Sequence, residues 1–232
     1  MDINKYGRRI GSQYGEAGII EYILTKIGSG NKELLEIGYG TQSNTVNLLS
    51  NHGWYGWLFD MSELSRIMAL ARWEKCKPVT AFITRENVND VLSSNDVPKF
   101  VDLISIDIDG NDYWIWEAVD VYSNILVIEY NATFGDTESI TIEYKPDFDR
   151  MKVHPSYHGA SLVALTKLAK VKGYALIGCE SNGVNAFFIN RGLLREGLEE
   201  ISPKEAYRKH VSRGSWRHEL EILKSRYKFV EV

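Results

Sequence analysis

The sequence predicts an α/β fold in which a mostly parallel β-sheet carries helices on both faces. Short apolar runs alternate with helical patterns, and strands that are apolar on both faces are typical of a buried parallel sheet. An Asn-Gly dipeptide between two late apolar runs adds an antiparallel hairpin. The five expected parallel strands are the runs LLEIG (34–38), YGWLFD (55–60), VTAFI (79–83), VDLISIDI (101–108) and ILVIEY (125–130).

The helices are predicted from apolar residues that recur every three to four positions. The first, at about 16–28, places four isoleucines and one leucine on a single face. A later helix covers about 159–172 and ends at Gly173, and the hairpin with its Asn182-Gly183 turn comes directly after it. Between the strands, helices are expected at about 42–51, 62–75, 86–93 and 112–120.

We expect a single domain spanning residues 1–232, with two less regular segments. Residues 132–158 lose clear periodicity after the fifth strand, and an insert of this length in a compact domain is usually functional. We therefore expect this insert to cover a bound substrate. Residues 192–232 are rich in charge and are expected to form a helical C-terminal tail.

Charge and hydropathy exclude several classes of partner. The net charge of the 232 residues is −4 and the 27 Lys and Arg residues are scattered, so no nucleic-acid partner is expected. The N-terminus lacks the apolar core of a signal peptide, and no apolar run approaches the about 18 residues of a membrane span. The sequence therefore predicts a cytoplasmic protein without a membrane segment, and it leaves the oligomeric state open.

A glycine turn and an acid follow the first two expected strands. In an open parallel sheet, ligands bind at the carboxyl ends of the strands, where the strand order reverses. The first strand runs into Glu36, Gly38 and Gly40, and glycines at such a turn let a ligand approach the backbone closely. The second strand ends in Asp60, 22 residues after Gly38, where an acid can bind the hydroxyl groups of a ribose.

Two nucleotide-type cofactors have to be compared for this turn. A nicotinamide dinucleotide requires the pattern G-x-G-x-x-G, and Ser43 stands where the third glycine would be. S-adenosylmethionine has no pyrophosphate and instead needs an acid entering the turn, a glycine loop and an acid for the ribose. The turn and Asp60 supply all three, so S-adenosylmethionine is the expected cofactor. An NAD-dependent oxidoreductase is the alternative.

Acids also follow the fourth and fifth expected strands. Asp107 and Asp109 come at the end of the fourth strand, and Glu129 and Asn131 at the end of the fifth. Asp107 and Asp109 are expected to share one strand face by alternation and to face the methyl donor. The four side chains form an oxygen-only set of the kind that Mg²⁺ prefers, or the acids act directly as a base. Asp112 is expected to be a first-turn acid of the next helix.

Two histidines lie near the end of the insert. His154 and His158 are candidate general bases because the pKa of histidine lies near neutrality. Each is equally compatible with a solvated loop position.

The motifs E-I-G-Y-G and W-L-F-D resemble those of class I S-adenosylmethionine-dependent methyltransferases. More specifically, S-Q-Y-G-E-A-G-I-I-E-Y-I, S-N-T-V-N-L-L, D-L-I-S-I-D-I-D-G-N-D-Y-W-I-W-E and V-I-E-Y-N resemble FkbM-like methyltransferases. The resemblance covers about residues 12–190. It implies a Rossmann-like sheet of seven strands with the last one antiparallel, and methyl transfer to oxygen, commonly on sugars or natural products.

The resemblance also implies roles for individual residues. Glu36, Gly38 and Gly40 would cradle the cofactor, and Asp60 would hold its ribose. Residues Thr84 to Asn87, after the third strand, would lie near the adenine. The chain departs from the family pattern at Gln42, where a third glycine is common.

The expected function is therefore that of a S-adenosylmethionine-dependent O-methyltransferase. The expected acceptor is a small molecule or saccharide, in particular a hydroxyl of a saccharide or nucleotide-sugar, and magnesium assistance is left open. Besides the NAD-dependent oxidoreductase, a second alternative is a non-catalytic binding module that retains the cofactor pocket.

Overall fold

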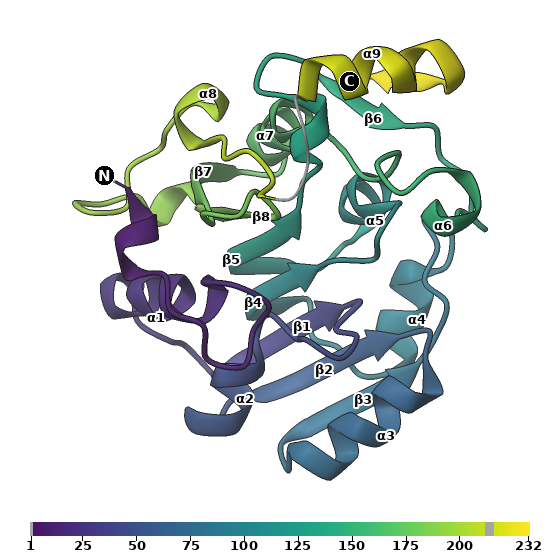
Figure 1. The fold of residues 1–232 in the computed structure, drawn as a ribbon. Helices are drawn as coiled ribbons and strands as arrows, with labels where there is room; N and C mark the ends of the chain where they lie inside the picture. Colours follow the sequence, from purple (N-terminus) through teal and green to yellow (C-terminus); the bar gives the residue numbers. More distant parts are fainter. Residues whose placement is uncertain (1, 212–215) are drawn as a thin grey trace.

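The computed structural model describes residues 2–211 and 216–232, and its centre is a seven-stranded sheet in the order β3-β2-β1-β4-β5-β8-β7 (Figure 1). The strands from β3 to β5 in this order are parallel, and β8 is antiparallel to both β5 and β7. This topology confirms the predicted fold class, including the antiparallel hairpin. The strands are β1 (Glu33–Ile37), β2 (Tyr55–Asp60), β3 (Cys76–Thr80), β4 (Phe100–Ile106), β5 (Tyr122–Glu129), β7 (Tyr174–Cys179) and β8 (Asn185–Asn190).

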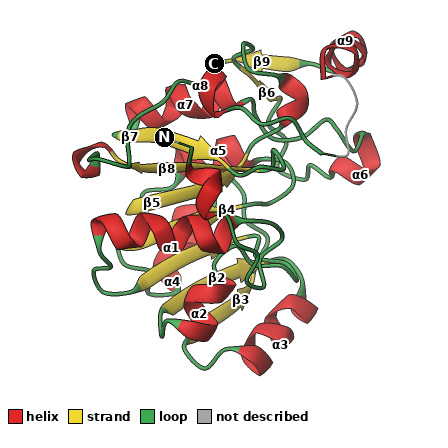
Figure 2. Ribbon diagram, turned by 60° about the vertical axis from the view of Figure 1, so that its left-hand side comes forward, coloured by secondary structure: helices red, strands yellow, loops and turns green. Residues whose placement is uncertain are grey.

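Helices cover both faces of the sheet and form two separate cores with it (Figure 2). Among the described residues, no helix is both long enough and apolar enough to cross a membrane. One face carries η1 (Ile3–Tyr6), α1 (Glu16–Ile27), α2 (Val46–Asn51) and α3 (Glu63–Arg72). The other carries α4 (Val88–Ser94), α5 (Asp112–Ala118), α7 (Leu162–Val171) and α8 (Pro203–Ala206).

The apolar strands form the middle of the sheet because both of their faces are buried. In β1, Leu34 packs in the core on the α1 side and Leu35 packs in the core on the α5 side. In β4, all residues after Phe100 are buried. Burial on both faces is the reason why these strands read as continuous apolar runs in the sequence.

The hairpin between β7 and β8 turns at the predicted Asn-Gly dipeptide. Gly183 has a φ of +74°, a conformation that L-residues rarely adopt. A Cβ atom at this position would also lie 2.5 Å from the carbonyl oxygen of Arg208. Both constraints explain why glycine follows Asn182 here.

The edge strand β3 and the central strand β4 have bounds that differ from the prediction. The third strand was expected at 79–83 but β3 begins at Cys76, because it is a half-buried edge strand and no apolar run marks it. The fourth was expected to reach residue 108 but β4 ends at Ile106. Asp107 therefore lies in the loop that follows β4.

The expectation of a helical tail over 192–232 is only partly correct. The segment contains α8 and α9 (Trp216–Arg226), but it ends in strand β9 (Phe229–Glu231). Strand β9 pairs antiparallel with β6 (Ile140–Ile142) of the insert. Each of these strands has three residues and its partner is distant in the chain, so no local periodicity signals the pair. Residues 212–215 of the expected tail lie outside the described residues.

The insert and the C-terminal segment form a third, smaller core. The insert contains η2 (Ala132–Phe134), β6 and α6 (Arg150–Val153). Phe134, Tyr157 and Leu223 are buried in the core between β6 and α9. Lys224 of α9 adds an ion pair with Glu138, with 2.7 Å between Nζ and Oε2. The C-terminal segment thereby holds the insert in place above the carboxyl ends of the strands (Figure 1).

The contact between Gly38 and the end of β4 gives a test of the fold. Gly38→Ala should lower the free energy of unfolding by more than about 3 kcal/mol, because its φ is +82° and the new Cβ would lie 1.8 Å from the carbonyl oxygen of Asp107. Urea denaturation measures this change. Gly40→Ala is the matched control, since a Cβ there meets open space and should cost only about 1–2 kcal/mol. Equal losses in the two variants would contradict this account.

Candidate functional site

The carboxyl ends of β1, β2, β4, β5 and β7, with the loops that follow them, form what we call the carboxyl rim. Within the sheet, β1 lies between β2 and β4, so the chain leaves β1 toward one side and later returns on the other. This reversal of strand order opens a crevice at the carboxyl ends of the strands, which is where open α/β sheets bind ligands. Every residue predicted for cofactor binding lies on or beside this rim.

Glu36 shapes the loop that follows β1. Its buried carboxylate accepts hydrogen bonds from Ser43 Oγ at 2.6 Å, from the backbone N–H of Asn44 at 2.8 Å and from Thr45 Oγ1. Burial raises the pKa of Glu36, and these hydrogen bonds oppose that rise. The carboxylate is thus directed at residues 43–45, and Glu36 fixes the path of the loop between the glycine turn and α2.

Gly40 and Asp60 are linked across the rim. The backbone N–H of Gly40 donates to Asp60 Oδ2 at 2.9 Å, and the N–H of Ser62 donates to Asp60 Oδ1 at 2.7 Å. Each carboxylate oxygen has two lone pairs, so Asp60 retains the capacity to accept from two neighbouring hydroxyl groups. This is the property expected of an acid that binds a ribose.

Thr84 and Asn87 fold the turn between β3 and α4. The N–H of Thr84 donates to Asn87 Oδ1 at 2.8 Å, and the N–H of Asn87 donates to Thr84 Oγ1 at 3.3 Å. The amide of Asn87 also donates to the carbonyl oxygen of Phe82 at 2.9 Å. The two side chains therefore fix the shape of the turn, and their place near an adenine stays a prediction.

Two exposed apolar side chains at this place were missed by the sequence reasoning. Met61 follows Asp60 and is 74% exposed, and Phe82 is 51% exposed. Their backbones are neighbours, since the N–H of Ala81 donates to the carbonyl oxygen of Asp60 at 2.8 Å. The sequence did contain a signal for them, because an apolar residue follows the end of each of the two adjacent strands β2 and β3.

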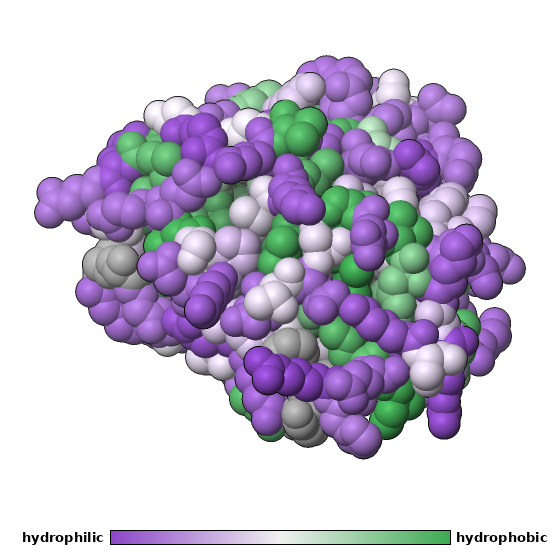
Figure 3. Space-filling model, turned by 90° about the horizontal axis from the view of Figure 1, so that it is seen from above, coloured by the Kyte–Doolittle hydropathy of each residue, from purple (hydrophilic) through white to green (hydrophobic). Residues whose placement is uncertain are grey.

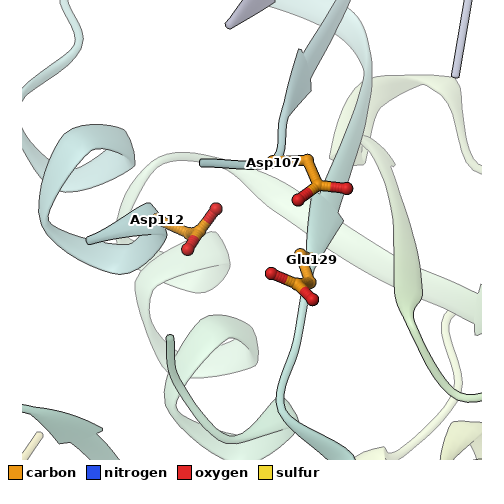
Figure 4. Close-up of side chains that lie close together, drawn as sticks. All are labelled: Asp107, Asp112 and Glu129. Atoms are coloured by element: carbon orange, nitrogen blue, oxygen red, sulfur yellow. The ribbon is translucent and has the colours of Figure 1, made fainter. Parts of the chain in front are cut away.

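Three carboxylates meet where β4, β5 and α5 converge. Asp107 follows β4, Glu129 ends β5 and Asp112 begins α5, and one oxygen of each lies within 4.8 Å of the others. Figure 4 shows the three side chains directed toward one another. We call them the acid cluster. Asp112 belongs to it although the sequence indicated only a first-turn acid, which it also is as the first residue of α5. Its carboxylate accepts from the N–H groups of Ile108 and Gly110, in the loop before the helix, at 2.8 and 3.0 Å.

The acid cluster is electrostatically unfavourable on its own. Burial, followed by repulsion among the carboxylates, raises the pKa of Asp107 and Glu129 well above the ordinary values. Burial likewise raises the pKa of Asp112 to about 6, against the effect of its backbone hydrogen bonds. The Oε2 atom of Glu129 is buried and accepts no hydrogen bond within the described structure.

This donor set fits a hard divalent cation such as Mg²⁺. Hard cations take oxygen ligands, and a divalent charge would offset the repulsion that raises the three pKa values. Glu129 Oε2 offers a buried lone pair that protein groups leave unused. Asp107, Asp112 and Glu129 are therefore the residues that would hold such an ion.

Asp109 and Asn131, two of the residues predicted to bind a metal, do not join the acid cluster. Strand alternation does not extend to Asp109, because β4 ends at Ile106 and Asp109 has a φ of +59°. Its exposed carboxylate pairs with Arg150 of α6, at 2.7 Å between Oδ1 and Nη1. The Asn131 amide donates to the carbonyl oxygens of Ser156 and His158, both at 2.9 Å, and so ties the insert to β5.

The two candidate histidines occupy different environments. His158 is buried, and its Nδ1 lies 3.6 Å from Glu129 Oε2, beside the acid cluster. His154 lies at the end of α6, where its Nδ1 accepts from the N–H of Ser156 at 3.2 Å and its ring lies against Tyr227. The structure thus places His158, and not His154, next to the acids.

Buried charge in the described part of the chain is acidic. No lysine or arginine there is buried, whereas six carboxylates are. Glu36, Asp112, Glu129 and Glu180 lie at the carboxyl rim, and Glu16 of α1 lies beside it, where its Oε1 accepts from the amide of Asn185 at 3.1 Å. Asp102 lies at the opposite edge, where it accepts from the N–H groups of Gly30 and Glu33.

Neither a known protein family nor a curated protein matches the sequence. Among solved structures, the fold is similar to a chain of a fibrillarin/Nop5p complex, with 14% identity, 79% of this chain and 87% of that chain covered, and a TM-score of 0.44. It is also similar to a S-adenosylmethionine-dependent methyltransferase from Clostridium acetobutylicum (14% identity, 73% and 88% covered, TM-score 0.46). A further similar structure is the N-terminal domain of EvdMO1 with SAH bound (12% identity, 76% and 80% covered, TM-score 0.44). These likenesses concern the fold alone.

The acid cluster predicts an unusual response to a neutral substitution. Without divalent ions and at about pH 8, Asp107→Asn should raise the free energy of unfolding by about 1–3 kcal/mol, because burial and then repulsion by the other acids make a charge at this position unfavourable. The pKa of Asp107 is raised on folding, so its charge destabilises the fold above its ordinary pKa. The gain should therefore shrink as the pH falls toward about 4.

Thermal denaturation with and without Mg²⁺ completes this test. Mg²⁺ should raise the Tm of the wild type and not that of Asp107→Asn, because an ion bound only by the native state stabilises it. Asp109→Asn is the control: it should keep the Mg²⁺ response and change stability by less than about 1 kcal/mol, since its carboxylate is exposed. A Tm of the wild type that is insensitive to Mg²⁺ would exclude the ion from this site.

Proposed function

We propose that the chain is a S-adenosylmethionine-dependent methyltransferase that acts on a hydroxyl group. The observation that carries this proposal is the set of buried acids at a rim that also has a glycine turn and Asp60. The rim offers buried carboxyl groups as hydrogen-bond acceptors and no buried lysine or arginine among the described residues, a lining that favours a cationic ligand over an anionic one. S-adenosylmethionine carries a sulfonium and an ammonium, whereas the pyrophosphate of NAD carries two negative charges and would be repelled.

Residues at the rim supply the contacts that such a cofactor requires. The turn at Gly38 and Gly40 lets a ligand approach the backbone, and Asp60 would accept from the ribose hydroxyls. Met61 and Phe82 offer apolar surface for the adenine beside Asp60. Bound there, S-adenosylmethionine would supply an electrophilic methyl group.

The acid cluster would activate the acceptor. A hydroxyl oxygen is a weak nucleophile until it loses its proton, and Mg²⁺ held by Asp107, Asp112 and Glu129 would lower the pKa of a hydroxyl. His158, 3.6 Å from Glu129 at Nδ1, is placed to receive a proton or to orient Glu129. Asp109 and Arg150 would limit the site on the side of α6.

The proposed acceptor is a saccharide or nucleotide-sugar, an assignment that depends on the resemblance of the motifs to FkbM-like methyltransferases. The insert supports a role in acceptor binding, because Asn131 and His158 connect it to the carboxyl rim. Its aromatic core with α9 and β9 gives it a fixed shape, as a selective cover requires. A nucleotide-sugar would bring negative charge near the acids, so a divalent cation would be needed for that subclass.

Calorimetric titration tests the cofactor assignment. S-adenosylhomocysteine should bind the wild type and NAD should not. Asp60→Ala should weaken S-adenosylhomocysteine binding by about 10–100-fold, because hydrogen bonds to a charged group are lost. Phe82→Ala should weaken the binding by about tenfold, because apolar contact with the adenine is lost. Asp120→Ala, which removes an exposed acid paired with Lys99, should leave binding unchanged.

Three outcomes separate the candidate functions. Binding of NAD without S-adenosylhomocysteine would contradict the proposal and favour an oxidoreductase. Binding of S-adenosylhomocysteine, followed by labelled methyl transfer to one member of a panel of sugars and nucleotide-sugars, would support it. Binding without transfer to any hydroxyl acceptor would favour the non-catalytic module.

A further inference from the structure

A cavity of about 640 Å³ opens beside α1, on the face of the sheet that carries η1 and α2. Its walls are largely apolar and include Tyr22 and Leu24 of α1, Leu48 of α2 and Trp54. A volume of this size is typical of sites that bind a small organic molecule. We call this space the α1 cavity.

The α1 cavity is separate from the carboxyl rim. Its lining includes Lys32 and Trp54, which directly precede β1 and β2, so it lies at the amino ends of these strands. Both strands run from this end of the sheet toward the rim (Figure 1). On the face above α9, by contrast, hydrophilic side chains surround only small apolar groups (Figure 3). The ligand of the rim therefore does not account for the cavity.

The charged residues around the α1 cavity are mostly basic. Lys5, Arg8 and Lys32 line it together with a single acid, Glu21. The Glu21 carboxylate is satisfied within the chain, since it pairs with Arg8 and accepts from the amide of Asn47 at 2.7 Å. Three bases against one acid leave an excess of two positive charges, counted with histidine neutral. This balance is opposite to that of the rim, whose buried charged groups are acids.

Lys5 and Lys32 carry this excess of positive charge. Within the described residues, neither is paired with a carboxylate: Lys32 Nζ donates to the carbonyl oxygen of His52 at 3.3 Å, and Lys5 Nζ lies 5.1 Å from the centre of the Tyr6 ring. An ammonium group has three N–H donors, so Lys32 can still donate to a bound anion.

The backbone of Lys32 is held in an unfavourable conformation. Its φ is +60°, in the left-handed region that residues with a side chain rarely adopt. Glycine would adopt this φ without strain, whereas the lysine keeps the strain and supplies a charge beside the cavity. Residues held in this way often lie at binding sites.

We infer that the α1 cavity binds an organic anion, with an apolar body against Leu24 and Leu48 and an acidic group, a carboxylate or a phosphate, on Lys5 and Lys32. A neutral apolar molecule would leave the two ammonium groups without a counter-charge, and an inorganic anion would leave the apolar walls in contact with water. The inference uses no part of the proposed function, so either can fail without the other.

Fluorescence titration with anilinonaphthalene sulfonate tests the inference, because this dye joins apolar rings to a permanent anion. The wild type should bind the dye, and Lys32→Gly should weaken the binding by about tenfold or more, since a charge-assisted hydrogen bond is lost. The Tm of Lys32→Gly should stay the same or rise, because glycine relieves the strain at this φ. Lys152→Ala is the matched control: it removes an exposed lysine of α6 that pairs with Asp149 and should leave dye binding unchanged.

A second variant and a competition series separate the cavity from adsorption to the surface. Thr25→Trp should fill the cavity without changing its charge and should also weaken dye binding, with circular dichroism as the check of folding. Octanoate or octyl phosphate should displace the dye, and the better competitor identifies the acidic group. Octanol and inorganic phosphate should not displace it at the same concentrations.

Four results would overturn the inference. These are the absence of dye binding, dye binding that withstands both Lys32→Gly and Thr25→Trp, failure of both octyl anions to displace the dye, and displacement by octanol or inorganic phosphate alone.

Discussion

The end of β1 is held between β2 and β4, and the arrangement of the carboxyl rim depends on this contact. The N–H of Asp107 donates to the carbonyl oxygen of Ile37 at 3.0 Å, and the N–H of Gly38 donates to the carbonyl oxygen of Phe59 at 2.7 Å. Gly38 is so close to the backbone of Asp107 that no side chain fits between them. Three strands consequently end at one level, which brings the glycine turn, Asp60 and the acid cluster together.

The acids at the rim differ in how their charge is compensated. Glu36 is surrounded by hydrogen-bond donors of its own loop, and Glu180 accepts from the N–H of Val184 at 2.6 Å. Such acids serve the fold, since backbone donors stabilise a buried carboxylate. Glu129 Oε2 has no hydrogen-bond donor, and Glu129 and Asp107 repel one another. A cluster that costs stability in the free protein is what a cation site requires, because the ligand supplies the missing charge.

Most of the sheet and part of the rim could be predicted from the sequence because they depend on local patterns. Strand β2 ends at Asp60 as predicted, since its apolar run stops there. Asp109 was expected among the clustered acids and Asp112 outside them, and the structure has the reverse. The left-handed turn at Asp109 breaks the alternation from which its position was predicted. The pairing of β6 with β9 and the contact of the buried Glu16 with Asn185 join distant segments, which no local pattern encodes.

The central claim is that one rim holds both a cationic methyl donor and a divalent ion. A crystal structure of the protein with S-adenosylhomocysteine and Mn²⁺ tests it most directly, because Mn²⁺ takes the same oxygen ligands as Mg²⁺ and scatters anomalously. The account predicts an anomalous peak among Asp107, Asp112 and Glu129, with the ribose of S-adenosylhomocysteine on Asp60. An anomalous peak elsewhere, or S-adenosylhomocysteine bound away from Asp60, would contradict it.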